Sequence, residues 1–206
     1  MKVILVNGSP RENGCTSVAL KEVAASLEKN GVQTEIFWIG AKAVQGCTGC
    51  GVCRKNSDKQ CVFDDMVNAF AKKASEADAF VFGSPVFFAG PNGSLLAFMD
   101  RLFFAHGQAL KGKPAACVAA ARRAGTSATF DSINKYFAFN QMPIVSSNYW
   151  NAVHGKTSDD VQHDLEGLQT MRILGCNMAW LLKCIKKARI PFPESEPKVW
   201  TNFVRN

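Results

Sequence analysis

Short apolar segments alternate with segments of helical periodicity along most of the chain, and this order limits the fold more than any other sequence feature. Segments 2–6, 32–39, 79–82, 114–121 and 142–147 have the composition of buried strands. Helical spacing predicts a helix that ends before Asn30-Gly31 and further helices over about 64–75, 92–104, 126–139 and 159–187. The alternation predicts the α/β class, with a doubly wound five-stranded parallel sheet and a ligand site at the carboxyl ends of its strands.

Length and composition favour a single domain. The chain has 206 residues, of which 47% are hydrophobic, and this is enough for one well-buried core. We expect a ligand-binding domain over 1–190 and a proline-containing C-terminal extension over 191–206. The first apolar run is too short for a signal peptide, and no run of about 18 apolar residues could span a bilayer. A soluble, cytoplasmic protein with no membrane partner is therefore expected.

The charge pattern argues against a nucleic-acid partner. The formal net charge is +7 at pH 7, but Lys and Arg are spread along the chain without a basic tract. A dispersed pattern is typical of a solvated basic surface rather than a nucleic-acid site. Attraction of an acidic redox protein is an alternative role for this charge.

The loop after the first predicted strand has the features of an anion site. A helix that starts directly after a strand presents unpaired N–H groups and the positive end of its dipole. Ser9, Gly14, Thr16 and Ser17 let a phosphate approach, and Arg11 adds a charged donor. The loop has neither G-x-G-x-x-G nor G-x-x-x-x-G-K-[ST], so neither a dinucleotide fingerprint nor an ATPase loop is supported. An ordinary turn capped by Thr16 is the alternative.

Three segments together resemble the NADPH-dependent FMN reductase family. They are 8–16, which begins Gly-Ser-Pro-Arg, 83–88, which reads Gly-Ser-Pro-Val-Phe-Phe, and 98–101, which reads Phe-Met-Asp-Arg. The resemblance covers 1 to about 155 and implies a flavodoxin-like fold with bound FMN. In that family the first loop holds the FMN phosphate. This implies the ligands Ser9, Arg11, Gly14, Thr16 and Ser17, whereas Cys15 departs from the family's usual asparagine.

Two further loops at predicted strand ends correspond to flavin-binding loops of that family. In 83–90 a rigid proline followed by aromatic residues offers an apolar wall to the flavin ring, and glycine gives access to backbone amides. In 122–126 amides and a cation can stabilise negative charge on the reduced ring. The predicted ring-binding residues are Pro85, Val86, Phe87, Phe88 and Gly90 in the first of these loops and Arg122, Arg123, Ala124, Gly125 and Thr126 in the second.

Half of the eight cysteines are clustered, at Cys47, Cys50, Cys53 and Cys61. Clustering favours a metal or redox site over a disulfide framework. The spacing resembles that of the iron–sulfur flavoproteins, a branch of the same family, and this implies a [4Fe–4S] cluster beside FMN. Redox thiols without a metal and a zinc ion are alternatives that the spacing leaves open.

The function implied by the resemblance needs no catalytic side chain. None of the three histidines has the spacing of a metal site or a catalytic triad, and a flavin carries its own redox chemistry. We expect an FMN-dependent oxidoreductase that takes electrons from NAD(P)H and passes them to a small acceptor. The alternative is a carrier that receives electrons from an acidic ferredoxin through a [4Fe–4S] cluster. Surplus apolar helical surface and the family's usual pairing predict a homodimer or homotetramer.

Overall fold

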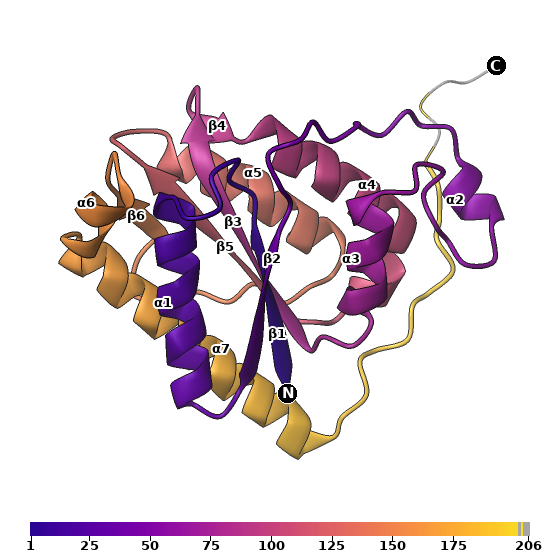
Figure 1. The fold of residues 1–206 in the computed structure, drawn as a ribbon. Coiled ribbons are helices and arrows are strands. Elements are labelled where there is room, and N and C mark those ends of the chain that lie inside the picture. The colour runs from indigo at the N-terminus through magenta and orange to yellow at the C-terminus, as the bar shows by residue number, and fades with distance from the viewer. Residues whose placement is uncertain (202, 204–206) are drawn as a thin grey trace.

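A parallel sheet forms the centre of the computed structural model, which describes residues 1–201 and 203 (Figure 1). Its strands are β1 (Lys2–Asn7), β2 (Gln33–Trp38), β3 (Ala79–Phe87), β5 (Ala115–Ala121) and β6 (Ala152–His154). They lie in the order β2-β1-β3-β5-β6, and each neighbouring pair is parallel. A further strand, β4 (Gly90–Pro91), pairs antiparallel with the end of β3. The predicted doubly wound α/β fold is confirmed, with β4 as an addition.

Helices cover both faces of the sheet (Figure 1). One face packs against α1 (Cys15–Lys29), α6 (Ser158–Gln162) and α7 (Leu165–Ala188), and the other against α3 (Met66–Ala74), α4 (Gly93–Leu110) and α5 (Thr126–Phe139). A short helix, α2 (Val52–Lys55), lies in the connection between β2 and α3. Along β1, Val3 and Leu5 contact the first helical layer, whereas Ile4 and Val6 contact the second. Alternate residues of a strand point to opposite faces, so a strand covered on both sides must be apolar throughout.

The second layer is rich in phenylalanine, which fixes α4 against the sheet. The ring of Phe98 on α4 lies 5.2 Å from that of Phe70 on α3, at an edge-to-face angle. Phe82 of β3 lies 5.4 Å from Phe137 of α5. These side chains are fully buried, and aromatic pairs of this kind add about 0.5–1.5 kcal/mol to the effect of burial alone. The position of α4 matters because its start and its middle contact two different candidate sites.

The last strand is not where the sequence predicts it. In place of a strand over 142–147, that segment has an isolated bridge between Ile144 and Ala115, and the strand β6 follows at Ala152–His154. Pro143 cannot donate a ladder hydrogen bond. Between the two paired segments the Asn151 side chain donates to the carbonyl of Cys117 over 3.0 Å. The prediction of a buried strand over 142–147 is wrong, because Pro143, Ile144 and Ser146 are exposed and the pairing is interrupted before a ladder forms.

The predicted C-terminal helix is divided in two. Instead of one helix over 159–187, α6 ends at Gln162 and α7 begins at Leu165, with Asp164 between them accepting a hydrogen bond from Gly167 N–H. A carboxylate at this position caps the new helix. After α7 the described residues form neither helix nor strand, and Phe192 packs beside Lys111 at the C-terminal end of α4. Within the described residues, the structure contains no helix with the length and apolarity needed to span a membrane.

Candidate functional site

A pocket of about 250 Å³ opens at the carboxyl ends of β1, β3 and β5. This edge of a doubly wound sheet is where ligands bind. Four segments that are distant in sequence meet here. The lining residues are Ser9, Pro10, Arg11, Gly14, Cys15, Thr16, Pro85, Val86, Phe87, Ala120, Arg122, Gly155 and Lys156.

The first loop is held in place by its own hydrogen bonds. The Asn7 side chain accepts from Ser9 N–H and donates to the Glu12 carbonyl, and the Trp38 indole donates to the Ser9 carbonyl over 2.8 Å. The Ser9 hydroxyl accepts from Arg11 N–H. Because these bonds hold the loop in one conformation, the start of α1 faces the pocket, and the loop need not move for a ligand to reach it.

The start of α1 leaves donors for an anion. Gly14 is the N-cap residue and supplies no side-chain cap, so the first amides of the helix are open to a ligand. The Thr16 hydroxyl is buried and has no hydrogen-bond partner among the described residues. A buried, unsatisfied hydroxyl costs about 1–3 kcal/mol, and a phosphate oxygen would satisfy it. These residues therefore fit the phosphate of an FMN molecule, with the exposed Arg11 side chain beside them. Ser17 is buried and does not line the pocket.

The second loop contributes three of its five predicted ring-binding residues. Pro85, Val86 and Phe87 line the pocket. Phe88 does not, because it is at the tip of the hairpin between β3 and β4 with its side chain fully exposed. Phe88 and Ala89 have φ values of 49° and 59°, which few non-glycine residues adopt. Gly90 also lies outside the lining and pairs with Phe87 across the hairpin.

In the third loop the structure distinguishes the two arginines. Arg122 lines the pocket, and Arg123, Ala124, Gly125 and Thr126 do not. Gly125 has a φ of 92°, and a Cβ atom there would lie 2.6 Å from the Ala89 Cα atom. Glycine is therefore required where this loop packs against the β3–β4 hairpin. Thr126 lines a neighbouring pocket of about 400 Å³ instead, together with Tyr149, Trp150 and His154.

The predicted site residues do not include the fourth wall of the pocket. Gly155 and Lys156 lie directly after β6, so their position follows from the register of that strand. A prediction that places the last strand at 142–147 puts them eight and nine residues beyond its end. The signal that could have found them is the short Ala152–His154 run, which is too brief to distinguish from irregular structure.

The four clustered cysteines lie together in the connection between β2 and α3. All of them line one small cavity of about 20 Å³. Cys53 is buried, Cys61 is half-buried, and Cys47 and Cys50 are exposed. Burial raises the pKa of the Cys53 thiol, and the negative charges of Cys61, Cys50 and Cys47 raise it further. A hydrogen bond from the Val52 backbone, with one from Thr48, lowers the pKa of Cys50.

The four cysteine thiols have the chemistry of metal or cluster ligands. Four thiols of one loop around one cavity fit an iron–sulfur cluster in ligand type and number. The cavity has space for about one water molecule, so the loop would have to widen to admit a cluster. Among the described residues, no three His, Cys, Asp or Glu side chains are grouped closely enough to hold a single metal ion.

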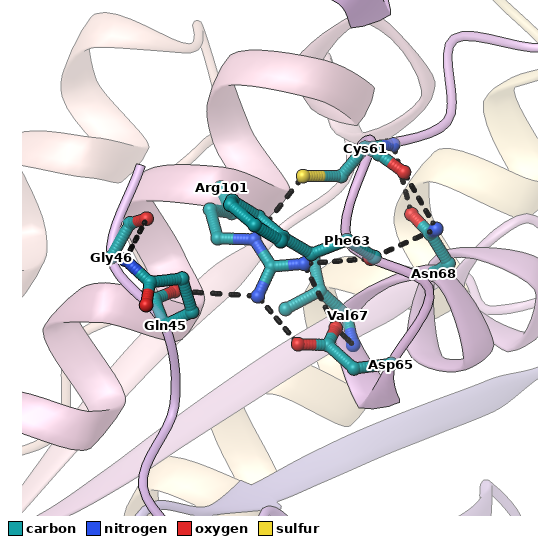
Figure 2. Close-up of polar contacts among 8 residues, drawn as sticks. All are labelled: Gln45, Gly46, Cys61, Phe63, Asp65, Val67, Asn68 and Arg101. Atoms are coloured by element: carbon teal, nitrogen blue, oxygen red, sulfur yellow. Dashed lines mark hydrogen bonds and ion pairs between the residues drawn. The ribbon is translucent and has the colours of Figure 1, made fainter. Parts of the chain in front are cut away.

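A buried arginine next to the cysteines was not predicted as a site residue. Arg101 of α4 is 1% exposed, and Figure 2 shows its guanidinium between the two ends of the cysteine loop. It donates to both Asp65 carboxylate oxygens over 2.6 and 2.9 Å, to the Cys61 sulfur over 3.2 Å and to the Gln45 and Phe63 carbonyls over 3.3 and 2.9 Å. Burial opposes its charge, but the hydrogen bonds that Arg101 donates to Asp65 and Cys61 outweigh burial and raise the pKa of Arg101.

Solved structures with the same fold include RosB and a flavodoxin. The chain aligns with RosB, which holds an 8-demethyl-8-formylriboflavin-5'-phosphate intermediate, with a TM-score of 0.70 and 13% identity, covering 100% of this chain and 96% of that one. It aligns with a flavodoxin from the domain Archaea with a TM-score of 0.58 and 18% identity, covering 89% and 99%. At these identities the comparison defines the fold, which is flavodoxin-like.

The sequence comparisons define the family within that fold. Residues 1–157 match the family of NADPH-dependent FMN reductases, and the chain belongs to this family. An iron–sulfur flavoprotein of Methanocaldococcus jannaschii is 34% identical over 195 residues, covering 91% of this chain and 100% of that protein. The predicted resemblance, including the iron–sulfur flavoprotein branch, is confirmed. The chain is thus a flavodoxin-like oxidoreductase of an FMN-binding family.

Proposed function

We propose that this chain is an FMN-dependent NAD(P)H oxidoreductase that passes electrons from a reduced nicotinamide to a small-molecule acceptor. The observation that carries the proposal is the pocket at the ends of β1, β3 and β5, with the unsatisfied Thr16 hydroxyl beside the open start of α1. Membership of the FMN reductase family supports the same cofactor and donor. Bound FMN supplies the redox chemistry in such a protein.

The residues of this chain would bind and orient the cofactor. The α1 amides and the Thr16 hydroxyl would hold the phosphate, with Arg11 adding a charged donor. Pro85, Val86 and Phe87 would form an apolar wall that excludes water from one side of the ring. Arg122, the pocket's arginine in the third loop, would stabilise negative charge on the ring.

A second candidate function is an iron–sulfur flavoprotein that carries electrons from a ferredoxin. Two observations favour it: the four cysteines line one cavity, and a relative of matching length is an iron–sulfur flavoprotein. Cys47, Cys50, Cys53 and Cys61 would be the ligands of a [4Fe–4S] cluster. The net charge of +7 suits an acidic partner protein, and the cytoplasm, where thiols stay reduced, suits the cysteine loop.

Anaerobic reduction of the flavin separates the two functions. We expect NADPH or NADH to bleach the flavin absorbance of the purified protein under argon, in a fast reaction that a stopped-flow spectrophotometer records. Bleaching by reduced ferredoxin, with none by either nicotinamide, would support the carrier. If neither donor reduces the flavin while dithionite does, both proposals are wrong.

Exposed apolar side chains lead us to propose a homodimer or homotetramer. Phe139, Leu165, Trp180 and Ile190 are all more than half exposed, and exposed apolar side chains mark an interface where they form a contiguous patch. Light scattering at micromolar concentration, with and without FMN, is expected to give at least twice the chain mass. A mass near 22.4 kDa in both conditions would show a monomer.

A further inference from the structure

The guanidinium of Arg101 connects both ends of the cysteine loop to one helix. Gln45 precedes the first cysteine of the motif and Asp65 follows the last, and Arg101 donates to both. Between these contacts it reaches the Cys61 sulfur over 3.2 Å (Figure 2). A lysine could not make these contacts together, because they use the flat fork of five donors that only arginine has.

The helix that carries Arg101 is also fixed to the flavin pocket. At the N-cap of α4, the Asn92 side chain donates to the Gly8 carbonyl over 2.6 Å, and Asn92 N–H donates to the Ser84 hydroxyl over 2.9 Å. Gly8 precedes Ser9, the first residue of the predicted phosphate site, and Ser84 lies in the predicted flavin-binding loop 83–90. The α4 helix, which is packed in place by Phe98, thus contacts the flavin pocket at its first residues and the cysteine loop at Arg101.

We propose that Arg101 is a positioning residue for the cysteine loop, which it ties to α4 while placing a fixed positive charge against the Cys61 sulfur. The role in loop structure stands on the geometry alone, and the role of the charge rests on the proposed cluster. A cluster with four thiolate ligands gains negative charge when it is reduced, so a nearby cation favours the reduced form. The same hydrogen bond holds Cys61 in a fixed place.

A mere structural ion pair between α3 and α4 is the competing explanation. Such a pair needs Asp65, but it needs neither the bond to Cys61 nor the bond to Gln45. The two explanations differ in what happens when the pair is replaced without leaving a buried charge. Replacing both partners of a buried pair is often close to neutral for stability, and serine keeps the cap that Asp65 gives to α3.

The test uses the Arg101→Met/Asp65→Ser double variant, with Arg101→Lys as the charge-keeping variant. Arg54→Met is the matched control, because Arg54 lies in the same loop but its side chain rests on the exposed Phe104 ring. The first measurement is hydrogen exchange over 45–65 in the cluster-free full chain, with α1 as the internal reference. The second is cluster retention and midpoint potential after anaerobic loading with iron and sulfide.

We expect faster exchange over 45–65 in the double variant and in Arg101→Lys, with α1 unchanged. Cluster affinity should fall about 10- to 100-fold in the double variant, as for other groups that hydrogen-bond to metal ligands. Its midpoint potential should become more negative, because the lost guanidinium contacts the Cys61 sulfur over 3.2 Å whereas the lost Asp65 carboxylate contacts the guanidinium instead. Arg101→Lys should keep a potential closer to that of the unmodified protein. Arg54→Met should match the unmodified protein throughout.

Each part of the proposal has its own opposing result. Exchange over 45–65 that stays slow in both variants would overturn the positioning role. An unchanged midpoint potential in the double variant would overturn the role of the charge. If the unmodified protein takes up no iron, the carrier function and the role of the charge are both wrong, and the exchange comparison still decides whether Arg101 positions the loop. If the double variant does not fold, Arg101→Lys decides that comparison.

Discussion

Thr16→Val is expected to weaken FMN binding about 10- to 100-fold while leaving the FMN-free protein as stable as before or more stable. A hydrogen bond to a charged group contributes about 1.5–3 kcal/mol, and each 1.4 kcal/mol is about tenfold in affinity. The Thr16 hydroxyl is buried without a partner among the described residues, so its removal takes away a cost in the FMN-free protein. Valine has nearly the same shape, which leaves the packing of α1 against Gly83 in place.

Thr129→Val is the matched control for this substitution. The Thr129 hydroxyl is also buried without a partner among the described residues, but it lies on α5 outside the pocket lining. We expect a similar change in the urea midpoint and no change in the FMN dissociation constant, measured by fluorescence titration. Equal FMN affinity of Thr16→Val and the unmodified protein would show that the phosphate binds elsewhere.

Asp65→Ala is expected to lower the free energy of unfolding by about 3 kcal/mol, the lower end of the usual cost of removing one partner of a buried ion pair, because the Asp65 side chain is itself 35% exposed. The Arg101 side chain has no exposed surface, and Asp65 contacts it over 2.6 Å. Alanine would leave that charge without its carboxylate. It would also remove the hydrogen bond from Val67 N–H that caps α3, which adds about 1 kcal/mol to the loss.

The neighbouring residue provides the control for Asp65. Asp64 is exposed, and Asp64→Ala should change the free energy of unfolding by no more than about 0.5 kcal/mol. Urea unfolding of the two variants, followed by circular dichroism, gives the comparison. A difference of less than about 1 kcal/mol between them would mean that the carbonyls of Gln45 and Phe63 are sufficient for Arg101. The free energy of unfolding of Asp65→Asn should lie between those of Asp65→Ala and Asp64→Ala, because asparagine keeps an acceptor for the helix cap but loses the charge.

The two candidate sites share one helix, α4, and a shared helix would keep them at a fixed distance from each other if electrons pass between them. The α4 helix is bonded to Gly8 at its start and to the cysteine loop through Arg101. A change in that helix would therefore alter both sites. Such coupling suits a protein in which a cluster and a flavin exchange electrons, and it gives the second candidate function a structural basis without deciding between the two.

The start of α1 is an example of what residues close in sequence can predict. The phosphate loop was predicted from a strand, a break at Asn7-Gly8 and a helix rich in small residues, and the loop forms one wall of the pocket. Ligand binding by Ser9, Arg11, Gly14, Thr16 and Ser17 stays a prediction. The helix Thr126–Phe139 was predicted with the bounds it has. These features depend on residues close in sequence, whose periodicity and capping are visible without the fold.

Local sequence patterns were sufficient to predict the fold class, the position of the anion loop and the clustering of the cysteines, because each is a pattern among neighbouring residues. The folded structure was needed to show that Arg122 rather than Arg123 lines the pocket, that Gly155 and Lys156 join it, and that Arg101 contacts Cys61. Residue 101 lies 40 positions beyond residue 61, and no periodicity relates segments so far apart. Side-chain direction in an irregular loop depends on backbone angles and on packing from other segments, which no single stretch of sequence contains.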